Sequence, residues 1–222
     1  METGNWKPET GVFRFMNDSK KERVSFICKA SDEGKKVVDL IAEKSSLSKS
    51  LIKKLMTFGG VTQGFKGKKL RVRKAKALVK DGDKIECFFD PSIDLNESYD
   101  FKRLYKSKYF GIYLKPAGAL SEGTQYGDQI SLLRHVEVNK RFAYPVNRVD
   151  KEIEGPVVIA YDSKAQNILQ QKWRNDVIKK FIVIVKGSME GSGEIEFSIN
   201  NKFTLTKYNC LKDLDGNTLV EG

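Results

Sequence analysis

The sequence feature that most constrains the fold is a strongly basic segment between Lys44 and Lys84. The segment contains 13 lysines and arginines but only two acids, so it nets +11, which equals the formal net charge of the whole 222-residue chain. One compact module therefore carries the entire excess of positive charge. Clustered cations are typical of nucleic-acid binders, because contacts with phosphates release counterions. A merely solvated basic surface is the plainer alternative.

Apolar periodicity predicts two short helices at the start of this module. The stretch 36–44 predicts one amphipathic helix, and Ser48 can cap a second one that ends at the Gly59-Gly60 pair. Beyond the glycines the period changes, and residues 61–89 predict short strands separated by glycine turns. The apolar face of the second helix would consist of Leu51, Ile52, Leu55 and Met56.

The pieces DLIAEK, SKSLIKKLMTFGGV and VKDGDKIECFF resemble the RNA-binding domain named after ribosomal protein S-four, also called the alpha-L motif. That family usually has arginine at the position of Lys49, and often Asn-Gly in the turn that reads QGFKGKK here. The resemblance implies that the second helix and the adjoining loop lie against structured RNA and bind its phosphates rather than read its sequence. The candidate RNA contacts are then Lys49, Lys53, Lys54 and Lys68.

The rest of the composition excludes several kinds of site. Cys28, Cys87 and Cys210 are odd in number and widely spaced, which predicts neither a disulfide framework nor a metal site. His135 is the single histidine, so a zinc site or a histidine-based triad is hard to build, and we expect it to be an ordinary packed or surface residue. The start of the chain, METGNWKPETG, has no export signal, and no apolar run has membrane length, so we expect a soluble cytoplasmic protein.

Charged residues gather just before an apolar run in the second half of the chain. The run Pro156–Ala160 predicts a buried strand, and the loop before it holds Arg148 and Asp150. Taken alone, this Arg-x-Asp predicts only an ion pair in a turn. Its position in the chain favours a functional site instead, because a Lys115-Pro-Ala-Gly turn precedes it and a Lys-x-aromatic pattern ending at Phe181 follows it.

That order resembles the RluA type of RNA pseudouridine synthase over about residues 107–222, whose signature is His-Arg-Leu-Asp-x-x-Thr-Ser-Gly-Leu-Leu-Leu. The resemblance implies isomerisation of uridine to pseudouridine in structured ribosomal or transfer RNA, without a cofactor or a metal. Asp150 would be the catalytic carboxylate, whether it attacks the sugar, stabilises charge on it or abstracts a proton. Arg148 would hold the flipped nucleotide or fill its vacated place. Asn147 would stand where the family has histidine, and Phe181 would stack on the base where the family has tyrosine.

Departures from the signature leave a second hypothesis open. Glu154 and Pro156 replace the usual serine and leucine, and Phe181 has no hydroxyl for proton transfer. A later Gly-Arg-Thr-His-Gln-Ile-Arg stretch, whose cation typically pairs with the aspartate, is not found by residue 222. We therefore expect either an incomplete enzyme or a catalytically degenerate protein that uses the same fold as a scaffold to bind RNA. A carboxylate hydrolase that pairs Asp150 with Glu152 or Glu154 is disfavoured, because neighbouring loop acids show no designed spacing.

The sequence as a whole predicts an α+β protein with two folded parts. We expect an N-terminal extension over 1–30, an S-four-like RNA-binding domain over 31–90 and a linker over 91–106. The remainder, 107–222, would be an incomplete pseudouridine synthase domain with a mixed, mainly antiparallel sheet. Structured RNA is the expected partner, and a monomer the expected state.

Overall fold

The computed structural model of the protein describes residues 21–140, 142–199 and 202–222. The chain divides into two compact units, one that ends at Gln170 and one that runs from Gln171 to Gly222. The first 20 residues of the predicted N-terminal extension lie outside the described part of the chain.

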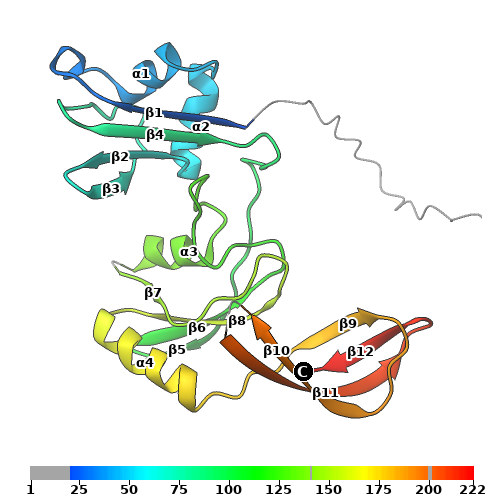
Figure 1. The fold of residues 1–222 in the computed structure, drawn as a ribbon. Helices are drawn as coiled ribbons and strands as arrows, with labels where there is room; N and C mark the ends of the chain where they lie inside the picture. The colour runs from blue at the N-terminus through cyan, green and yellow to red at the C-terminus, as the bar shows by residue number, and fades with distance from the viewer. Residues whose placement is uncertain (1–20, 141, 200–201) are drawn as a thin grey trace, which may run out of the picture. The chain divides into compact units, whose positions relative to one another are not determined.

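The basic module is built on an antiparallel sheet in the order β1-β4-β2-β3 (Figure 1). Helices α1 and α2 cover one face of this sheet, where Leu40 and Ile52 from the helices share a core with Val61, Ile85 and Cys87 from the strands. The elements are β1 Glu22–Ile27, the short 3-10 helix η1 Ala30–Asp32, α1 Val37–Glu43, α2 Lys49–Phe58, β2 Val61–Phe65, β3 Lys68–Arg71 and β4 Lys84–Phe89.

Helix α2 begins and ends where the sequence predicts. The Ser48 side chain accepts a hydrogen bond of 3.2 Å from the backbone N–H of Leu51, which caps the first turn. Gly59 has a φ of 95° and donates its N–H to carbonyls of the last turn. A residue with a Cβ adopts this left-handed conformation only at a cost, so the glycine pair ends the helix. Between these ends, Ile52 and Leu55 are buried.

A second antiparallel sheet, β5-β6-β8-β7, follows in the same unit. On its inner strand β8, Val157 and Ile159 share a core with Leu132 of helix α3, while the alternate residues Val158 and Ala160 are buried as well. Burial on both faces explains why this apolar run shows no alternation. The elements are β5 Arg103–Lys106, β6 Phe110–Lys115, α3 Leu132–Asn139, β7 Tyr144–Pro145, β8 Gly155–Ala160 and α4 Ser163–Asn175.

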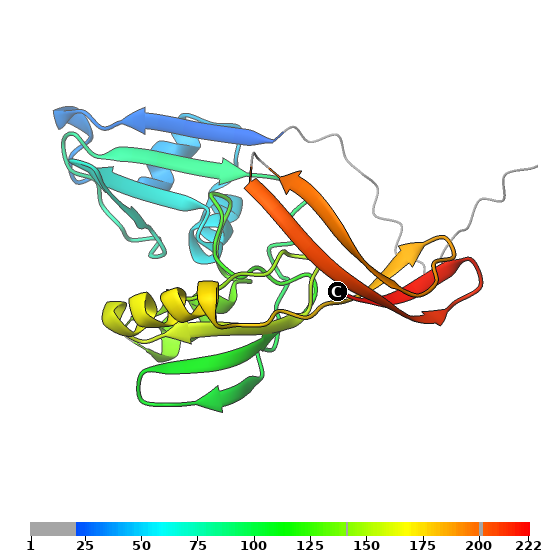
Figure 2. The same ribbon diagram turned by 60° about the horizontal axis from the view of Figure 1, so that its bottom comes forward.

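The second unit contains an antiparallel sheet in the order β10-β11-β12-β9, whose long β10–β11 hairpin is clear in Figure 2. Its strands are β9 Ile182–Lys186, β10 Ser192–Ile199, β11 Lys202–Asp213 and β12 Asn217–Glu221. Among its described residues only Thr218 and Val220 are buried, whereas Phe197 and Phe203 are about two-thirds exposed. This sheet therefore has little core of its own.

Two predicted boundaries differ from the structure. The segment 91–106, predicted as a linker, contains β5, because Arg103–Lys106 pairs with β6. The predicted N-terminal extension contains β1, because Glu22–Ile27 pairs with β4 along its whole length. None of the described helices is both long and apolar enough to cross a membrane.

Candidate active site

The loop that carries Asp150 runs from the end of β7 to the start of β8. Asn147 closes this loop, because its Oδ1 accepts a 2.8 Å hydrogen bond from Val158 N and its Nδ2 donates to Pro156 O at 3.3 Å. Both ends of the Asn147 amide thus bind the backbone of β8. The prediction that Asn147 binds substrate remains a prediction, but its side chain already shapes the loop.

A second set of bonds ties the middle of the loop to the turn after β6. The Ser121 hydroxyl donates to Val149 O at 2.7 Å and accepts from Val149 N at 3.1 Å. The Gly118 N–H donates to Lys151 O at 2.7 Å. Backbone atoms on both sides of Asp150 are therefore fixed, which sets the position of the Asp150 backbone.

Lys115 lies beneath this loop and is fully buried. Its ammonium donates to three backbone oxygens, those of Pro116 at 2.9 Å, Ala119 at 2.7 Å and Lys151 at 3.2 Å. Burial lowers the pKa of Lys115, and the negative charges of the loop acids, Asp150 among them, act in the opposite direction. The lysine of the Lys-Pro-Ala-Gly turn therefore supports the loop from below with a positive charge.

Asp150 itself is exposed, and its carboxylate has neither an ion pair nor a side-chain hydrogen bond within the described part of the chain. The ion pair with Arg148 that the Arg-x-Asp pattern alone predicts is not formed, because the Arg148 guanidinium lies 3.4 Å from the Glu122 carboxylate instead. That Arg148 binds substrate remains a prediction. Two exposed charges on one loop gain little from pairing with each other in water, whereas Glu122 offers Arg148 a partner from a different loop.

A surface cavity of about 380 Å³ lies next to Arg148. Asn147 and Glu122 line it, together with Gln166 and Gln170 of α4, whose side-chain amides both donate to Pro145 O. Polar groups dominate this cavity, which suits a polar ligand such as a nucleotide better than an apolar one. Asp150 is not among the residues that line it.

Phe181 lies in the second unit. Its backbone N–H donates a hydrogen bond of 2.8 Å to Gly222 O, and its carbonyl accepts one of 2.9 Å from Gly222 N. The residue is 44% exposed and so is accessible. Stacking of this ring on a uracil base remains a prediction.

The basic module uses part of its charge internally. Lys49, a predicted RNA contact, forms an ion pair of 2.7 Å with Asp39 and remains largely exposed. Lys53, Lys54 and Lys68 are exposed and have no ion pair among the described residues, so their charges are free for phosphates. Lys53 and Lys54 also line a surface groove of about 520 Å³.

Three other cations converge on Glu86, which lies on the sheet face opposite the helices. Lys69, Arg23 and Lys84 approach its carboxylate to 2.7, 3.0 and 3.5 Å. The hydrogen bond from Lys69 is the main reason that the pKa of Glu86 falls to about 2, with Arg23 adding to it. These three cations therefore form ion pairs within the protein itself and stabilise the sheet.

Two other reactive side chains of the first unit are packed against neighbouring side chains. His135 lies in α3 with its ring centroid 5.1 Å from that of Phe101. Burial raises the pKa of the Cys87 thiol to about 12, so it is no nucleophile at neutral pH. No group of three histidine, cysteine or acidic residues in the described ranges could hold a metal ion.

The comparison with known proteins falls on this same part of the chain. A family model for RNA pseudouridylate synthases matches residues 109–221, just over half of the sequence. The chain belongs to this family. The match includes the Asp150 loop, both strands β6 and β8, and the whole of β9 to β12.

Curated relatives of this family are similar at low identity. An uncharacterized RNA pseudouridine synthase of Mycoplasma genitalium is 26% identical over 157 residues, which cover 67% of this chain and 50% of that protein. The ribosomal large subunit pseudouridine synthase C of Vibrio parahaemolyticus is 24% identical, covering 59% and 48%. The tRNA pseudouridine synthase C of Pasteurella multocida is 26% identical, covering 43% and 41%. The chain thus spans about half the length of the curated relatives that it matches.

Solved structures of the family are also similar. Human RNA pseudouridylate synthase domain containing 4 is 21% identical with a TM-score of 0.42, covering 54% of this chain and 57% of that one. Human RNA pseudouridylate synthase domain containing 1 is 14% identical with a TM-score of 0.46, covering 55% and 58%.

Sequence reasoning missed the residues that fix the Asp150 loop from a distance. Ser121 and Glu122 precede the loop residues that they contact by 28 and 26 positions. No local pattern marks such partners. Lys115 is the exception, because the sequence already marks the Lys-Pro-Ala-Gly turn that contains it.

Proposed function

We propose that the protein is an RNA pseudouridine synthase that converts uridine to pseudouridine in structured RNA, ribosomal or transfer RNA, with Asp150 as its catalytic carboxylate. The observation that carries this proposal is the family match over 109–221, which includes a loop held on both sides of Asp150 by backbone hydrogen bonds.

The reaction needs few groups from the protein. The glycosidic bond from C1′ to N1 of uracil breaks and a bond from C1′ to C5 forms. C5 then loses its proton and N1 takes one up, so that substrate and product are isomers. A carboxylate can attack or stabilise the sugar carbon, or take up that proton, provided that it is ionised. Asp150 is exposed, so its carboxylate is accessible to a substrate.

RNA binding would come from the S-four-like module, over about residues 31–90. Its supporting features are the exposed cations Lys53, Lys54 and Lys68, together with Lys49 beside Asp39. The everted uridine would meet Asp150, and Arg148 would exchange Glu122 for an RNA phosphate or the vacated stack. We further propose that Phe181 stacks on the base, that the protein acts as a monomer, and that it works in the cytoplasm.

The experiment is to incubate the protein with unmodified transcripts of large-subunit ribosomal RNA and of transfer RNA, and to map pseudouridine. Asp150→Asn should abolish product, while Glu152→Gln, a neighbouring exposed acid of the same loop, should retain it. Because both side chains are exposed, neither variant should change the melting temperature. Equal product from wild type and Asp150→Asn would refute the catalytic role.

A second function deserves the same test, because Asp150 has no cationic partner among the described residues. The protein would then bind structured RNA and use its synthase fold as a scaffold. Salt-sensitive RNA binding by the wild type, without any pseudouridine, would support this reading. Weak binding that does not depend on salt would refute an RNA role of either kind.

A further inference from the structure

The C-terminal end of helix α2 is attached to the loop 124–129 by an unusual concentration of polar contacts. The Asp128 carboxylate forms ion pairs with two arginines of the basic module. Arg73 Nη2 lies 2.6 Å from each of its oxygens, and Arg71 Nε lies 3.1 Å from one of them. We call these three side chains the Asp128 cluster. Asp128 is 8% exposed, so this ion pair is well shielded from water.

The same arginines satisfy the last carbonyls of α2. Arg73 Nη1 donates to Thr57 O at 3.0 Å, and Arg71 Nη1 donates to Gly59 O. The backbone N–H groups of Asp128 and Gln129 both donate to Phe58 O, at 3.0 and 3.2 Å. Carbonyls at a helix end carry partial negative charge and need donors, and here the donors come from the loop and the cluster.

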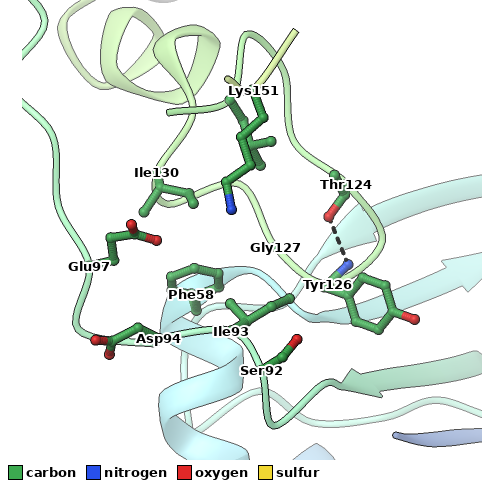
Figure 3. A pocket seen from close by; sticks show the side chains of 11 residues that line it. Phe58, Ser92, Ile93, Asp94, Glu97, Thr124, Tyr126, Gly127, Ile130 and Lys151 are labelled. Atoms are coloured by element: carbon green, nitrogen blue, oxygen red, sulfur yellow. Dashed lines mark hydrogen bonds between the residues drawn. The ribbon is translucent and has the colours of Figure 1, made fainter. Parts of the chain in front are cut away.

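Close packing surrounds these bonds. Any Cβ at Gly127 would overlap the Phe58 ring, and any Cβ at Gly60 would meet the backbone of Tyr126. A cavity of about 430 Å³ lies beside this junction, with Phe58 on one side of it (Figure 3). Lys151, the residue after Asp150, points its ammonium into the same cavity from the opposite side (Figure 3).

Hydrogen bonds also link the segment that follows this junction to Val149, the residue before Asp150. Leu120 bonds Ile130 and Leu132 through backbone groups, at 3.1 and 2.8 Å. The next residue, Ser121, forms two hydrogen bonds with the backbone of Val149 through its hydroxyl group. Helix α2 is therefore connected to the catalytic loop through short, paired segments rather than through a free linker.

We propose that Asp128 is a positioning residue that sets which uridine reaches Asp150. This inference rests on the proposed function. Helix α2 carries Lys53 and Lys54 on its exposed side, and the Asp128 cluster fixes its far end to the loop that supports the active site. RNA bound on α2 is thus held at one distance from Asp150, so that only a uridine at a matching place in the RNA can be everted into the site. Arg71 and Arg73 serve this attachment and are not RNA contacts.

Two variants and a control test the inference. Asp128→Ala removes both ion pairs, and Asp128→Asn keeps the shape and one acceptor but removes the charge. Asp81→Ala is the matched control, because it deletes an exposed acid of the same module that has no partner among the described residues. None of these residues belongs to the proposed catalytic or RNA-binding groups.

The first measurement is hydrogen exchange of the free protein. In Asp128→Ala the segments 55–60 and 124–131 should exchange about tenfold faster, because their shared bonds open more often. Asp128→Asn should show a smaller increase and Asp81→Ala none. Unchanged exchange in Asp128→Ala would overturn the attachment, whatever the RNA results are.

The second measurement is the ratio of pseudouridine at different uridines in the same transcripts. Wild type should modify one uridine strongly over its neighbours, and Asp128→Ala should lower that ratio by about fivefold while its RNA affinity stays within about twofold. A loss of folded protein scales all uridines equally and leaves the ratio unchanged, so the ratio separates positioning from stability. Faster exchange with an unchanged ratio would overturn the role in uridine choice.

The experiments distinguish failure of the proposed activity from failure of the attachment by Asp128. If the wild type forms no pseudouridine on any transcript, the proposed activity fails and the role of Asp128 in uridine choice fails with it. The exchange result then still decides whether Asp128 attaches α2 to the loop.

Discussion

At the scale of single residues, the loop that carries Asp150 is supported by residues that lie far from it in the sequence. The loop and its aspartate follow from the pattern before Pro156. The partners do not, because Arg148 pairs with Glu122, which lies 26 residues earlier in the chain. A sequence pattern shows neighbours along the chain, whereas an ion pair depends on neighbours in space.

Lys115 provides the sharpest prediction at this scale. Lys115→Met keeps the length of the side chain but removes a buried ammonium, so three carbonyls lose their donor. Leaving buried acceptors unpaired should lower the free energy of unfolding by about 2–4 kcal/mol, measured in urea. Lys102→Met, which replaces an exposed lysine of the same unit, should change it by less than about 0.5 kcal/mol. Similar losses in both variants would show that the three bonds contribute nothing specific.

At the scale of helices and strands, the sequence was informative where apolar residues mark a buried face and uninformative at polar edges. Helix α2 was predicted with both of its ends, because Ser48 and Gly59 mark them chemically. Strand β5 was missed and assigned to a linker. Its sequence, Arg103-Leu-Tyr-Lys, is exposed throughout, so no alternation reveals it, and only its pairing with β6 makes it a strand.

Glu86 makes the stability of the first sheet depend on pH. Its pKa is about 2 in the folded protein and about 4.5 when it is unperturbed, so its contribution is complete above pH 4.5 and is lost as the pH falls towards 2. Glu86→Gln should therefore remove part of the acid sensitivity of unfolding between these values. Glu33→Gln, at an exposed acid of the same module, should retain all of it. Identical acid profiles for Glu86→Gln and wild type would contradict this assignment.

At the scale of the whole molecule, the sequence predicted two folded parts, but the compact units of the structure divide elsewhere. The first unit joins the basic module to the β5-β6-β8-β7 sheet, and the second begins within α4. The predicted domain boundaries depended on the polar composition of residues 91–106. Composition could not reveal contacts such as those of Asp128, whose partners lie 55 and 57 residues earlier in the sequence.

The second unit should be the less stable one. Only two of its described residues are buried, so its backbone hydrogen bonds lack the apolar cover that protects β4 and β8. In a hydrogen-exchange experiment at neutral pH, β9 to β12 should lose protection well before β4 and β8 do. Equal protection across both units would show that this sheet is stabilised by more than its own packing.

The exposed phenylalanines and isoleucines of that sheet also affect whether copies of the protein associate in solution. Large apolar patches attract copies of the same molecule, and a net charge of +11 keeps the copies apart. Salt shortens the range of that repulsion to a few ångströms without weakening the apolar attraction. Light scattering should therefore rise with ionic strength, so dilute, low-salt buffers are the conditions in which this chain stays dispersed.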